Sequence, residues 1–352
     1  MNVTLWRDEA TFVRPVAAAA QRHDRRSRLF LFIEDGGVGG YGEVAPQTER
    51  LNGDPSIDDV IGELTSVTLP QLRSVVQREG SLPSWSRINR FAGSRASSAP
   101  AVALVEMALV DRELRASSIN AHTVWPRQGA TPLQTTVSLL DAHEPWIVDP
   151  SVARVRTKTG PGILSHHALD QLAALELPIV LDFNCSASSS DEVLSQVAQV
   201  ARVASIAAVE QPFAPGNVID HATLAARLGV ALSLDEGVRS QRDLEQIARY
   251  RAARMVCVKP ARVGGLANAR TLIVKATELG LSPYLGGFFE SPFARHVHRY
   301  LAENCVTEPS DLGPIAVTHG AMMPELEWAA GGFEVAPSRQ VLEKSAVIAT
   351  WT

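Results

Sequence analysis

The run VARVRTK at residues 152–158 is the first of five short apolar runs that each end in a charged residue. The others are PIVLD at 178–182, AAVE at 207–210, ALSLD at 231–235 and MVCVK at 255–259. Their charged ends recur every 24 to 28 residues, with Ala- and Leu-rich amphipathic stretches between them, and are Lys158, Asp182, Glu210, Asp235 and Lys259. This alternation predicts repeated strand-and-helix units.

Two further runs, Thr135–Leu139 and Ser282–Leu285, extend the predicted strands to seven. An eighth strand is needed to close a barrel, and we expect it between Cys305 and Leu312. The fold class is therefore α/β, with a TIM-like (β/α)7–8 barrel over residues 121–321. In a closed parallel barrel all the charged strand ends meet at one mouth, where barrel enzymes place their active sites.

The flanking sequence predicts a second, α+β part. Residues 1–120 contain an apolar strand from Arg28 to Asp35, a Gly-rich turn, and helices at Ile57–Glu79 and Ser98–Arg115. The last thirty residues, with Gly331 and Gly332, indicate a strand-and-turn tail over 322–352 that returns to this part. The basic run from His23 to Arg28 precedes the strand, and we interpret it as a surface loop.

Composition excludes several classes of function. The net charge of −5 leaves no excess of basic residues for a nucleic acid or an anionic membrane. No apolar stretch reaches eighteen residues and no signal region opens the chain, so we expect a cytoplasmic protein. The three cysteines are too few for a disulfide framework. The Gly-rich turn lacks the Lys-Ser/Thr of a nucleotide-binding P-loop, so we interpret it as structural.

The three acidic strand ends predict a metal site. Asp182, Glu210 and Asp235 would repel one another at one mouth, and coordination of a hard divalent cation resolves that repulsion. Ligands that are all oxygen favour Mg²⁺, or else Mn²⁺, over zinc. Three residues next to these ligands in the sequence could orient the ligands without binding the metal themselves, namely Asn184, Gln211 and Glu236.

Lys158 and Lys259 would then flank the metal. A lysine held between cations and apolar walls has its pKa lowered towards neutrality, which suits it to remove a proton α to a carboxylate. The metal would stabilise the enolate that forms. The residues alone therefore predict an enolising enzyme acting on a small carboxylate substrate.

Eight motifs together resemble the enolase superfamily, in particular its muconate-lactonizing subgroup. They span most of the chain and are GYGEVAP, ALVEMALVD, RTK, LDFN, EQP, LDEG, VKPARVGG and GGFFES. The resemblance implies that the α+β part is a capping domain, that Lys158 is an acid/base opposite Lys259, and that the three acids bind Mg²⁺. It also implies a homo-oligomer. Arg156 replaces the first lysine of the family's Lys-x-Lys motif; it keeps the charge but cannot shuttle protons.

The segments after the seventh strand most resemble o-succinylbenzoate synthases and N-acylamino acid racemases. We therefore expect a synthase-like dehydratase, with racemisation and muconate-type cycloisomerisation as alternatives. Asp311 is followed by Leu312 and Gly313, so the Asp-x-Asp of dipeptide epimerases is missing. By position in the family, the residues expected to contact or cover substrate are Phe12, Arg14, the loop from Ala17 to Arg28, Glu290 and Ser291. We interpret His296 and His298 as helix residues.

Two hypotheses of another kind remain open. A non-catalytic homologue could keep the site to bind a carboxylate, and the Arg156 replacement favours that hypothesis. A Schiff-base aldolase barrel would need a nucleophilic lysine but no metal triad, so sensitivity to chelators would separate it from an enolising enzyme.

Overall fold

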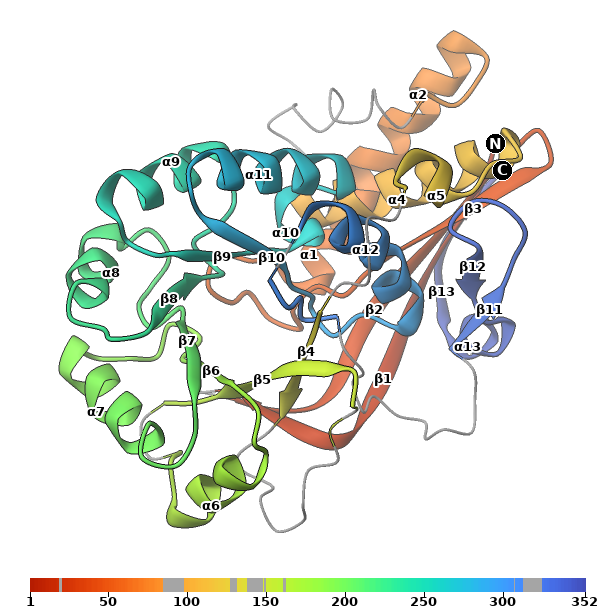
Figure 1. Ribbon diagram of the computed structural model, residues 1–352. Coiled ribbons are helices and arrows are strands. Elements are labelled where there is room, and N and C mark those ends of the chain that lie inside the picture. The colour runs from red at the N-terminus through yellow and green to blue at the C-terminus, as the bar shows by residue number, and fades with distance from the viewer. Residues whose placement is uncertain are drawn as a thin grey trace.

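A computed structural model describes residues 1–18, 21–84, 98–126, 132–137, 148, 150–160, 163–306, 308–312 and 325–352, with the backbone alone at 13–18, 21–23, 135 and 137. A curved parallel sheet and an antiparallel sheet stand side by side (Figure 1). Both parts of the predicted fold class are therefore present, a TIM-like barrel and an α+β capping part.

The parallel sheet has seven strands that follow the chain order from β4 to β10. They are β4 (Leu133–Val137), β5 (Val152–Lys158), β6 (Ile179–Asp182), β7 (Ile206–Glu210), β8 (Ala231–Leu234), β9 (Met255–Val258) and β10 (Ser282–Leu285). Most residues of β6 to β10 are buried, as continuous apolar runs covered on both faces require. All seven predicted strands are confirmed within the described residues.

Among the described residues, the sheet closes through one residue and not through a full eighth strand. Ser310 forms an isolated parallel bridge with Leu133 of β4. Its neighbour Asp311 donates its backbone N–H to the carbonyl of Leu285 in β10, at 2.8 Å. The predicted closing segment between Cys305 and Leu312 therefore does join the first strand to the last, but by a single bridge.

Helices connect the strands and cover the outer side of the sheet (Figure 1). They are α6 (His166–Ala174), α7 (Ser190–Val200), α8 (Val218–Ala225), α9 (Gln241–Tyr250), α10 (Pro260–Val263), α11 (Leu266–Glu278) and α12 (Pro292–Cys305). Ser165, Ser189 and Ser240 begin three of these helices, since each hydroxyl accepts a backbone N–H of the first turn.

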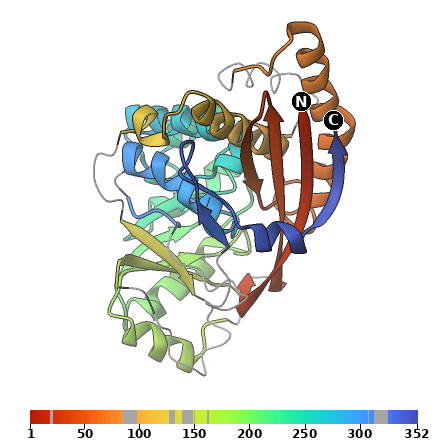
Figure 2. The same ribbon diagram turned by 90° about the vertical axis from the view of Figure 1, so that its right-hand side faces the viewer.

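The capping part combines the beginning and the end of the chain. Its sheet runs β13-β1-β2-β3, and Figure 2 shows β13 alongside β1 with both termini close together. Its elements are β1 (Asn2–Ala18), β2 (Gln21–Asp35), β3 (Val38–Val44), α1 (Ile57–Glu63), the π-helical turn η1 (Leu64–Thr68), α2 (Leu69–Glu79), α4 (Ala99–Ala116), β11 (Leu326–Trp328), β12 (Val335–Pro337), α13 (Arg339–Lys344) and β13 (Ala346–Trp351). The short helix α5 (Ala121–Val124) follows α4 and packs on the core of the barrel. The limits at 120/121 and 321/322 stay a prediction.

The two faces of β2 pack on different parts of the molecule. Leu29 and Leu31 join the apolar core under α1, α2 and α4, whereas Phe30 joins the core of the barrel. Successive side chains of a strand point to opposite faces. Even-numbered positions of β2 therefore face the barrel.

The interpretation of His23–Arg28 as a surface loop is wrong. These residues belong to β2, which pairs with β1 along a hairpin that extends to Ala18 and Gln21. Arg26, Ser27 and Arg28 are buried. The error arose because basic residues usually mark solvent, whereas here part of the hairpin is covered by the barrel. Within the described chain, none of the helices has the length and hydrophobicity that crossing a membrane requires.

Candidate active site

The five charged strand-end residues gather at one mouth of the barrel. In the sheet register Lys158 lies beside Asp182, and Asp182 lies beside Glu210. Asp235 and Lys259 directly follow β8 and β9. The three carboxylates are fully buried, and the lysines are 7% and 6% exposed. β5 and β9 are four strands apart, so the two lysines stand on opposite sides of the mouth.

We call the side around Lys158 the Lys158 half. Lys158 Nζ lies 2.5 Å from Asp182 Oδ2. Arg156, on the same strand, places Nη1 at 2.9 Å from Glu210 Oε1 and at 3.6 Å from Asp182 Oδ2. Its Nη2 reaches Asp311 Oδ2 at 2.5 Å. Arg156 thus joins two of the predicted ligands to the residue that follows the closing bridge.

The opposite side is the Lys259 half. Lys259 Nζ lies 2.8 Å from Asp235 Oδ2, and Arg262 Nη1 lies 2.5 Å from Asp235 Oδ1. The second guanidinium nitrogen of Arg262 reaches Asp54 Oδ2 at 2.8 Å. Lys259 Nζ also lies 4.6 Å from the centre of the Phe288 ring, within the range of a cation–π contact. A residue of the capping part, Asp54, therefore takes part in this half.

The ionisation of the carboxylates differs across the mouth. Burial, and then the neighbouring Asp182, raise the pKa of Glu210 to about 7, although Arg156 opposes them. Burial also acts to raise the pKa of Asp235, but Arg262 and Lys259 outweigh it and hold that pKa below the usual range. Of the three predicted ligands, Glu210 is the one whose negative charge the neighbouring cations offset least.

The depressed pKa predicted for Lys259 requires the charge of the metal, because the protein groups alone act on balance in the other direction. Burial acts to lower its pKa, but the carboxylate of Asp235 in direct contact raises it above the ordinary value. The sequence pattern did not reveal that each lysine would lie against one of the predicted ligands.

The donor atoms at the mouth suit a hard cation. All three predicted ligands are carboxylates, and two more buried oxygens beside them, Asn184 Oδ1 and Glu236 Oε2, lack a hydrogen-bond partner among the described residues. Such orphaned acceptors are costly unless a donor or a cation satisfies them. No three His, Cys, Asp or Glu side chains in the described ranges are already arranged around one point as metal ligands. Each predicted ligand contacts a lysine or an arginine.

The residues predicted to orient the ligands form hydrogen bonds at the mouth. Asn184 donates its backbone N–H to Asp182 Oδ1 at 2.9 Å and its amide to Glu236 Oε1 at 3.1 Å. Gln211 Oε1 accepts the backbone N–H of Asp235 at 2.9 Å, so it holds the turn that presents this acid. Asn184 and Gln211 have positive φ angles of 45° and 36°, a strained conformation that is common at functional sites.

The residues predicted to contact substrate lie in different surroundings. Phe12 packs edge-on against Phe289, with ring centres 5.3 Å apart, and is 5% exposed. The Arg14 side chain lies outside the described residues. Glu290 accepts the backbone N–H of Phe288 at 2.8 Å, and the Ser291 hydroxyl hydrogen-bonds Glu43 at 2.5 Å. Their contact with substrate stays a prediction.

Four residues of the site were not singled out from the sequence. Arg262 and Phe288 lie inside the quoted motifs VKPARVGG and GGFFES but carried no predicted role. Tyr284, whose hydroxyl donates to Glu210 Oε2 at 2.6 Å, looked like an ordinary strand residue. Nothing in the sequence around Asp54 indicated a role in the site, because only the docking of the capping part brings this residue to the mouth.

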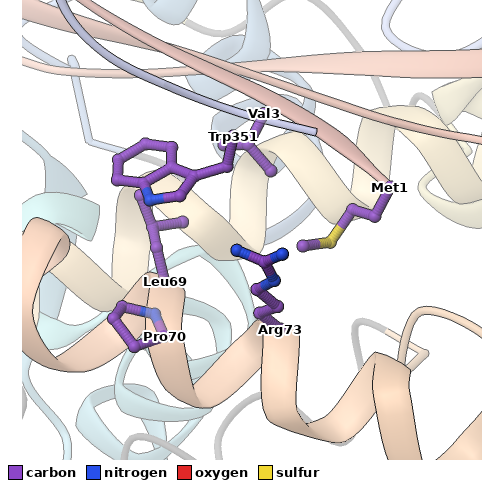
Figure 3. A pocket seen from close by; sticks show the side chains of 6 residues that line it. All are labelled: Met1, Val3, Leu69, Pro70, Arg73 and Trp351. Carbon is purple, nitrogen blue, oxygen red and sulfur yellow. The ribbon is translucent and has the colours of Figure 1, made fainter.

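A small apolar pocket of about 100 Å³ lies elsewhere, between α2 and the ends of β1 and β13 (Figure 3). Its lining includes Val3, Leu69 and Trp351, with Arg73 at one side. It contains none of the charged strand-end residues, so it is separate from the mouth.

Comparison with known proteins finds relatives for the barrel part of the chain. Residues 166–336 match the family described as enolase C-terminal domain-like. The chain is 30% identical over 195 residues to an o-succinylbenzoate synthase of Enterococcus faecalis, covering 49% of this chain and 52% of that protein. It is 26% identical over 207 residues to an N-succinylamino acid racemase of an Amycolatopsis species, covering 56% and 55%. The chain thus spans about half the length of these curated relatives.

The fold extends the likeness along the whole chain. An N-succinyl Arg/Lys racemase of Bacillus cereus superimposes with a TM-score of 0.80 over 100% of this chain and 98% of its own, at 16% identity. The family match covers the part of the barrel that carries four of the five charged strand ends, and the shared fold adds the capping part. Residues 166–336 therefore carry an enolase C-terminal domain-like domain, and the chain as a whole shares the fold of that racemase.

Proposed function

We propose that this chain is a Mg²⁺-dependent enzyme that removes the proton α to a substrate carboxylate, with dehydration of the o-succinylbenzoate synthase type as the best-supported reaction. One observation carries the proposal: two buried lysines, at the ends of β5 and β9, flank three buried carboxylates in the strand order of the sheet. Mn²⁺ could replace Mg²⁺ on the same ligands.

Asp182, Glu210 and Asp235 would hold the metal, supported by the unsatisfied oxygens of Asn184 and Glu236. Once bound, Mg²⁺ would supply positive charge to the carboxylate oxygens of the substrate as negative charge develops there. The lysines and arginines that now contact these acids would have to share them with the metal.

The two lysines would do the proton chemistry. Lys158 Nζ, in its neutral form, takes the α-proton, and the resulting ammonium then returns a proton to the departing hydroxyl. Lys259 Nζ stays charged on the opposite face and stabilises the enolate electrostatically. Arg156 holds Glu210 and Asp311 in place and, being permanently protonated, takes no part in proton transfer.

Racemisation is the second candidate, and one observation favours it. Each lysine lies against an aspartate at nearly equal distance, 2.5 Å for Lys158 and 2.8 Å for Lys259. Two equivalent amines could exchange protons on both faces of one carbon, as expected of a relative of the Amycolatopsis racemase. Cycloisomerisation would use the same residues on another substrate.

The test is α-proton exchange in D₂O with Mg²⁺, followed by NMR. The panel contains N-succinyl and N-acyl amino acids, dipeptides and the substrate of o-succinylbenzoate synthases, and Lys158→Ala is the control. Exchange that needs the metal and is lost in Lys158→Ala supports the enolising site. No exchange by the wild type on any compound would instead favour the non-catalytic carboxylate-binding protein. The expected homo-oligomer stays a separate prediction for light scattering.

A further inference from the structure

Tyr284 of β10 holds one oxygen of the predicted metal ligand Glu210. The tyrosine is fully buried, and its buried apolar neighbours all come from strands of the parallel sheet, so its ring lies inside the barrel. Its hydroxyl donates to Glu210 Oε2 at 2.6 Å. A phenol has one hydrogen to donate, so the Ser233 hydroxyl, 2.9 Å away, donates to the phenol oxygen in turn. Two hydrogen bonds therefore fix the Tyr284 hydroxyl on the carboxylate.

The other oxygen of Glu210 has a different kind of partner. Arg156 Nη1 lies 2.9 Å from Glu210 Oε1, and the same nitrogen lies 3.6 Å from Asp182 Oδ2. Because one nitrogen is shared by two predicted ligands, Oε1 lies on the side of Glu210 where the ligands gather. Oε2 lies on the side of Tyr284 and Ser233. The two oxygens of this one carboxylate thus have separate surroundings.

The charge of the partners differs as well. In the described ranges, the side chains that contact Asp182 and Asp235 are lysines and arginines, and Arg156 on Glu210 Oε1 is of the same kind. A divalent cation that enters the mouth repels these positive groups. The phenol of Tyr284 is neutral, so such a cation does not repel it. Its hydrogen bond to Glu210 Oε2 is therefore the contact that a bound metal disturbs least.

The Tyr284 ring is also held by a neighbouring side chain. Arg154 Cζ lies 5.1 Å from the ring centre, within the range of a cation–π contact. Arg154 is itself fixed, since Nε donates to Gln134 Oε1 at 2.5 Å and Nη2 donates to the carbonyl oxygen of Pro309 at 2.9 Å. A ring packed in this way cannot follow a carboxylate that turns, so Tyr284 holds Glu210 in one orientation.

A carboxylate that offers one oxygen distinguishes between two hard cations. Mg²⁺ requires a nearly octahedral set of about six oxygens, which single carboxylate oxygens and waters supply. Ca²⁺ is larger, accepts about six to eight oxygens and often takes both oxygens of one carboxylate. A ligand whose second oxygen is held by a protein hydroxyl therefore favours Mg²⁺ over Ca²⁺.

We propose that Tyr284 is a positioning residue that keeps Glu210 Oε2 away from the metal, so that Glu210 offers Oε1 alone and the site gains selectivity for Mg²⁺ over Ca²⁺. The inference rests on the proposed function, since it takes Glu210 as a metal ligand. It adds a residue inside the barrel, outside the set of charged strand ends, that determines which divalent cation the mouth accepts.

The test compares Mg²⁺ and Ca²⁺ binding in the wild type and in Tyr284→Phe, which keeps the ring and removes the hydroxyl. Melting temperatures of chelator-treated protein over a series of metal concentrations give both dissociation constants. The selectivity ratio is Kd for Ca²⁺ divided by Kd for Mg²⁺. Because a hydrogen bond to a charged group changes an equilibrium constant by about tenfold or more, we expect Tyr284→Phe to lower this ratio by about tenfold. A merely structural role would weaken both ions alike and leave the ratio unchanged.

Two further variants make the comparison specific. Tyr300→Phe is the matched control, because Tyr300 is also a buried phenol and donates to a carboxylate that is not a predicted ligand, Glu334, at 2.9 Å. It should leave the selectivity ratio unchanged. Ser233→Ala removes the donor that fixes the phenol oxygen, so it should lower the ratio in the same direction by a smaller factor, about threefold. If Tyr284→Phe unfolds, Ser233→Ala decides, and a wild-type ratio in that variant overturns the inference.

The outcomes separate the inference from the proposed function. An unchanged ratio in Tyr284→Phe, or an equal fall in Tyr300→Phe, overturns the inference, while the proposed function still stands on metal-dependent α-proton exchange. If the ratio falls as expected but the wild type exchanges no α-proton on any compound, the positioning role of Tyr284 stands without the enolising chemistry. If neither ion raises the melting temperature of the wild type, both the inference and the metal-dependent reaction fail.

Discussion

The Lys158 half and the Lys259 half of the mouth contain similar groups but are supported by different parts of the molecule. Each has a lysine on an aspartate and an arginine on a carboxylate. In the Lys158 half the arginine is Arg156, which joins Glu210 to Asp311 within the barrel. In the Lys259 half the arginine is Arg262, and Asp54 of the capping part, outside the barrel, pairs with it.

Two buried glutamates strengthen the link on the Lys259 side. Glu106 of α4 accepts the backbone N–H groups of Leu266 and Ala267 at the start of α11. Glu43 of β3 accepts those of Ser291 and Ala294 at the start of α12. Carboxylates at helix N-termini are favourable because unpaired N–H groups gather there. The Lys259 half therefore depends on how the capping part docks, whereas the Lys158 half is built from the barrel.

The largest effect should come from removing each lysine in turn. We expect Lys158→Ala and Lys259→Ala each to lose about 10³-fold in α-proton exchange, since a general acid or base typically contributes 10²–10⁴-fold. NMR in D₂O on separate enantiomers of an N-succinyl amino acid would measure it. If the halves serve opposite faces, each variant keeps some exchange of one enantiomer. Equal loss from both enantiomers in both variants would contradict separate roles.

Metal removal should affect both halves together. A chelator should reduce exchange by more than about 10²-fold, because the lost charge stabilisation amounts to several kcal/mol. Added Mg²⁺ should also raise the melting temperature of the wild type, since a ligand that binds the folded state stabilises it. Glu210→Gln should abolish that rise, and Glu245→Gln, at an exposed position of α9, should not. A full response in Glu210→Gln would remove this acid from the predicted ligands.

Asp54→Asn should weaken the Lys259 half alone. Removing one partner of a buried ion pair leaves Arg262 without half of its support and costs about 3 kcal/mol in the free energy of unfolding. Asp58→Asn is the control, because Asp58 pairs with Arg7 at the surface and such a pair contributes about 1 kcal/mol or less. Urea unfolding measures both. Equal losses in the two variants would show that the capping part does not support Arg262.

The smallest effect is a change in the pH dependence of stability on replacing Glu106. Burial raises the pKa of Glu106 to about 7, although the N–H groups of Ala267 and Leu266 oppose it. The folded state then binds more protons than the unfolded state from about pH 4.5 to 7, so stability falls as pH rises through this window. Glu106→Gln cannot ionise and should flatten the slope by up to about 1.4 kcal/mol per pH unit.

Urea unfolding between pH 4 and 8 would measure that slope. Glu113→Gln is the matched control, because Glu113 lies near the end of the same helix, α4, and is only half-buried. If the free energy of unfolding of Glu106→Gln has the same slope against pH as that of the wild type, then the Glu106 carboxylate of the wild type stays ionised at the start of α11. The link between α4 and the Lys259 half would then be independent of pH.

Prediction from the sequence succeeded where the signal was local. Runs such as IVLD and MVCV are buried strands because their apolar residues need covering on both faces, and the charged residue that ends each run lies at the mouth. The same reasoning failed for Arg26 and Arg28, since nothing near them in the chain reveals that the barrel covers β2. It also placed the closing segment between Cys305 and Leu312, where the described residues form one bridge at Ser310.

The sequence by itself determined the order of the strands and the chemical type of the charged residue at the end of five of them, because strand periodicity and charge are properties of neighbouring residues. Only the tertiary structure decided which groups meet. Asp54 and Arg262 are 208 residues apart in the chain, and Arg156 and Asp311 are 155 apart. Such pairs form when the barrel closes and the capping part docks, and burial then decides which charges are offset by the protein and which are left for a ligand.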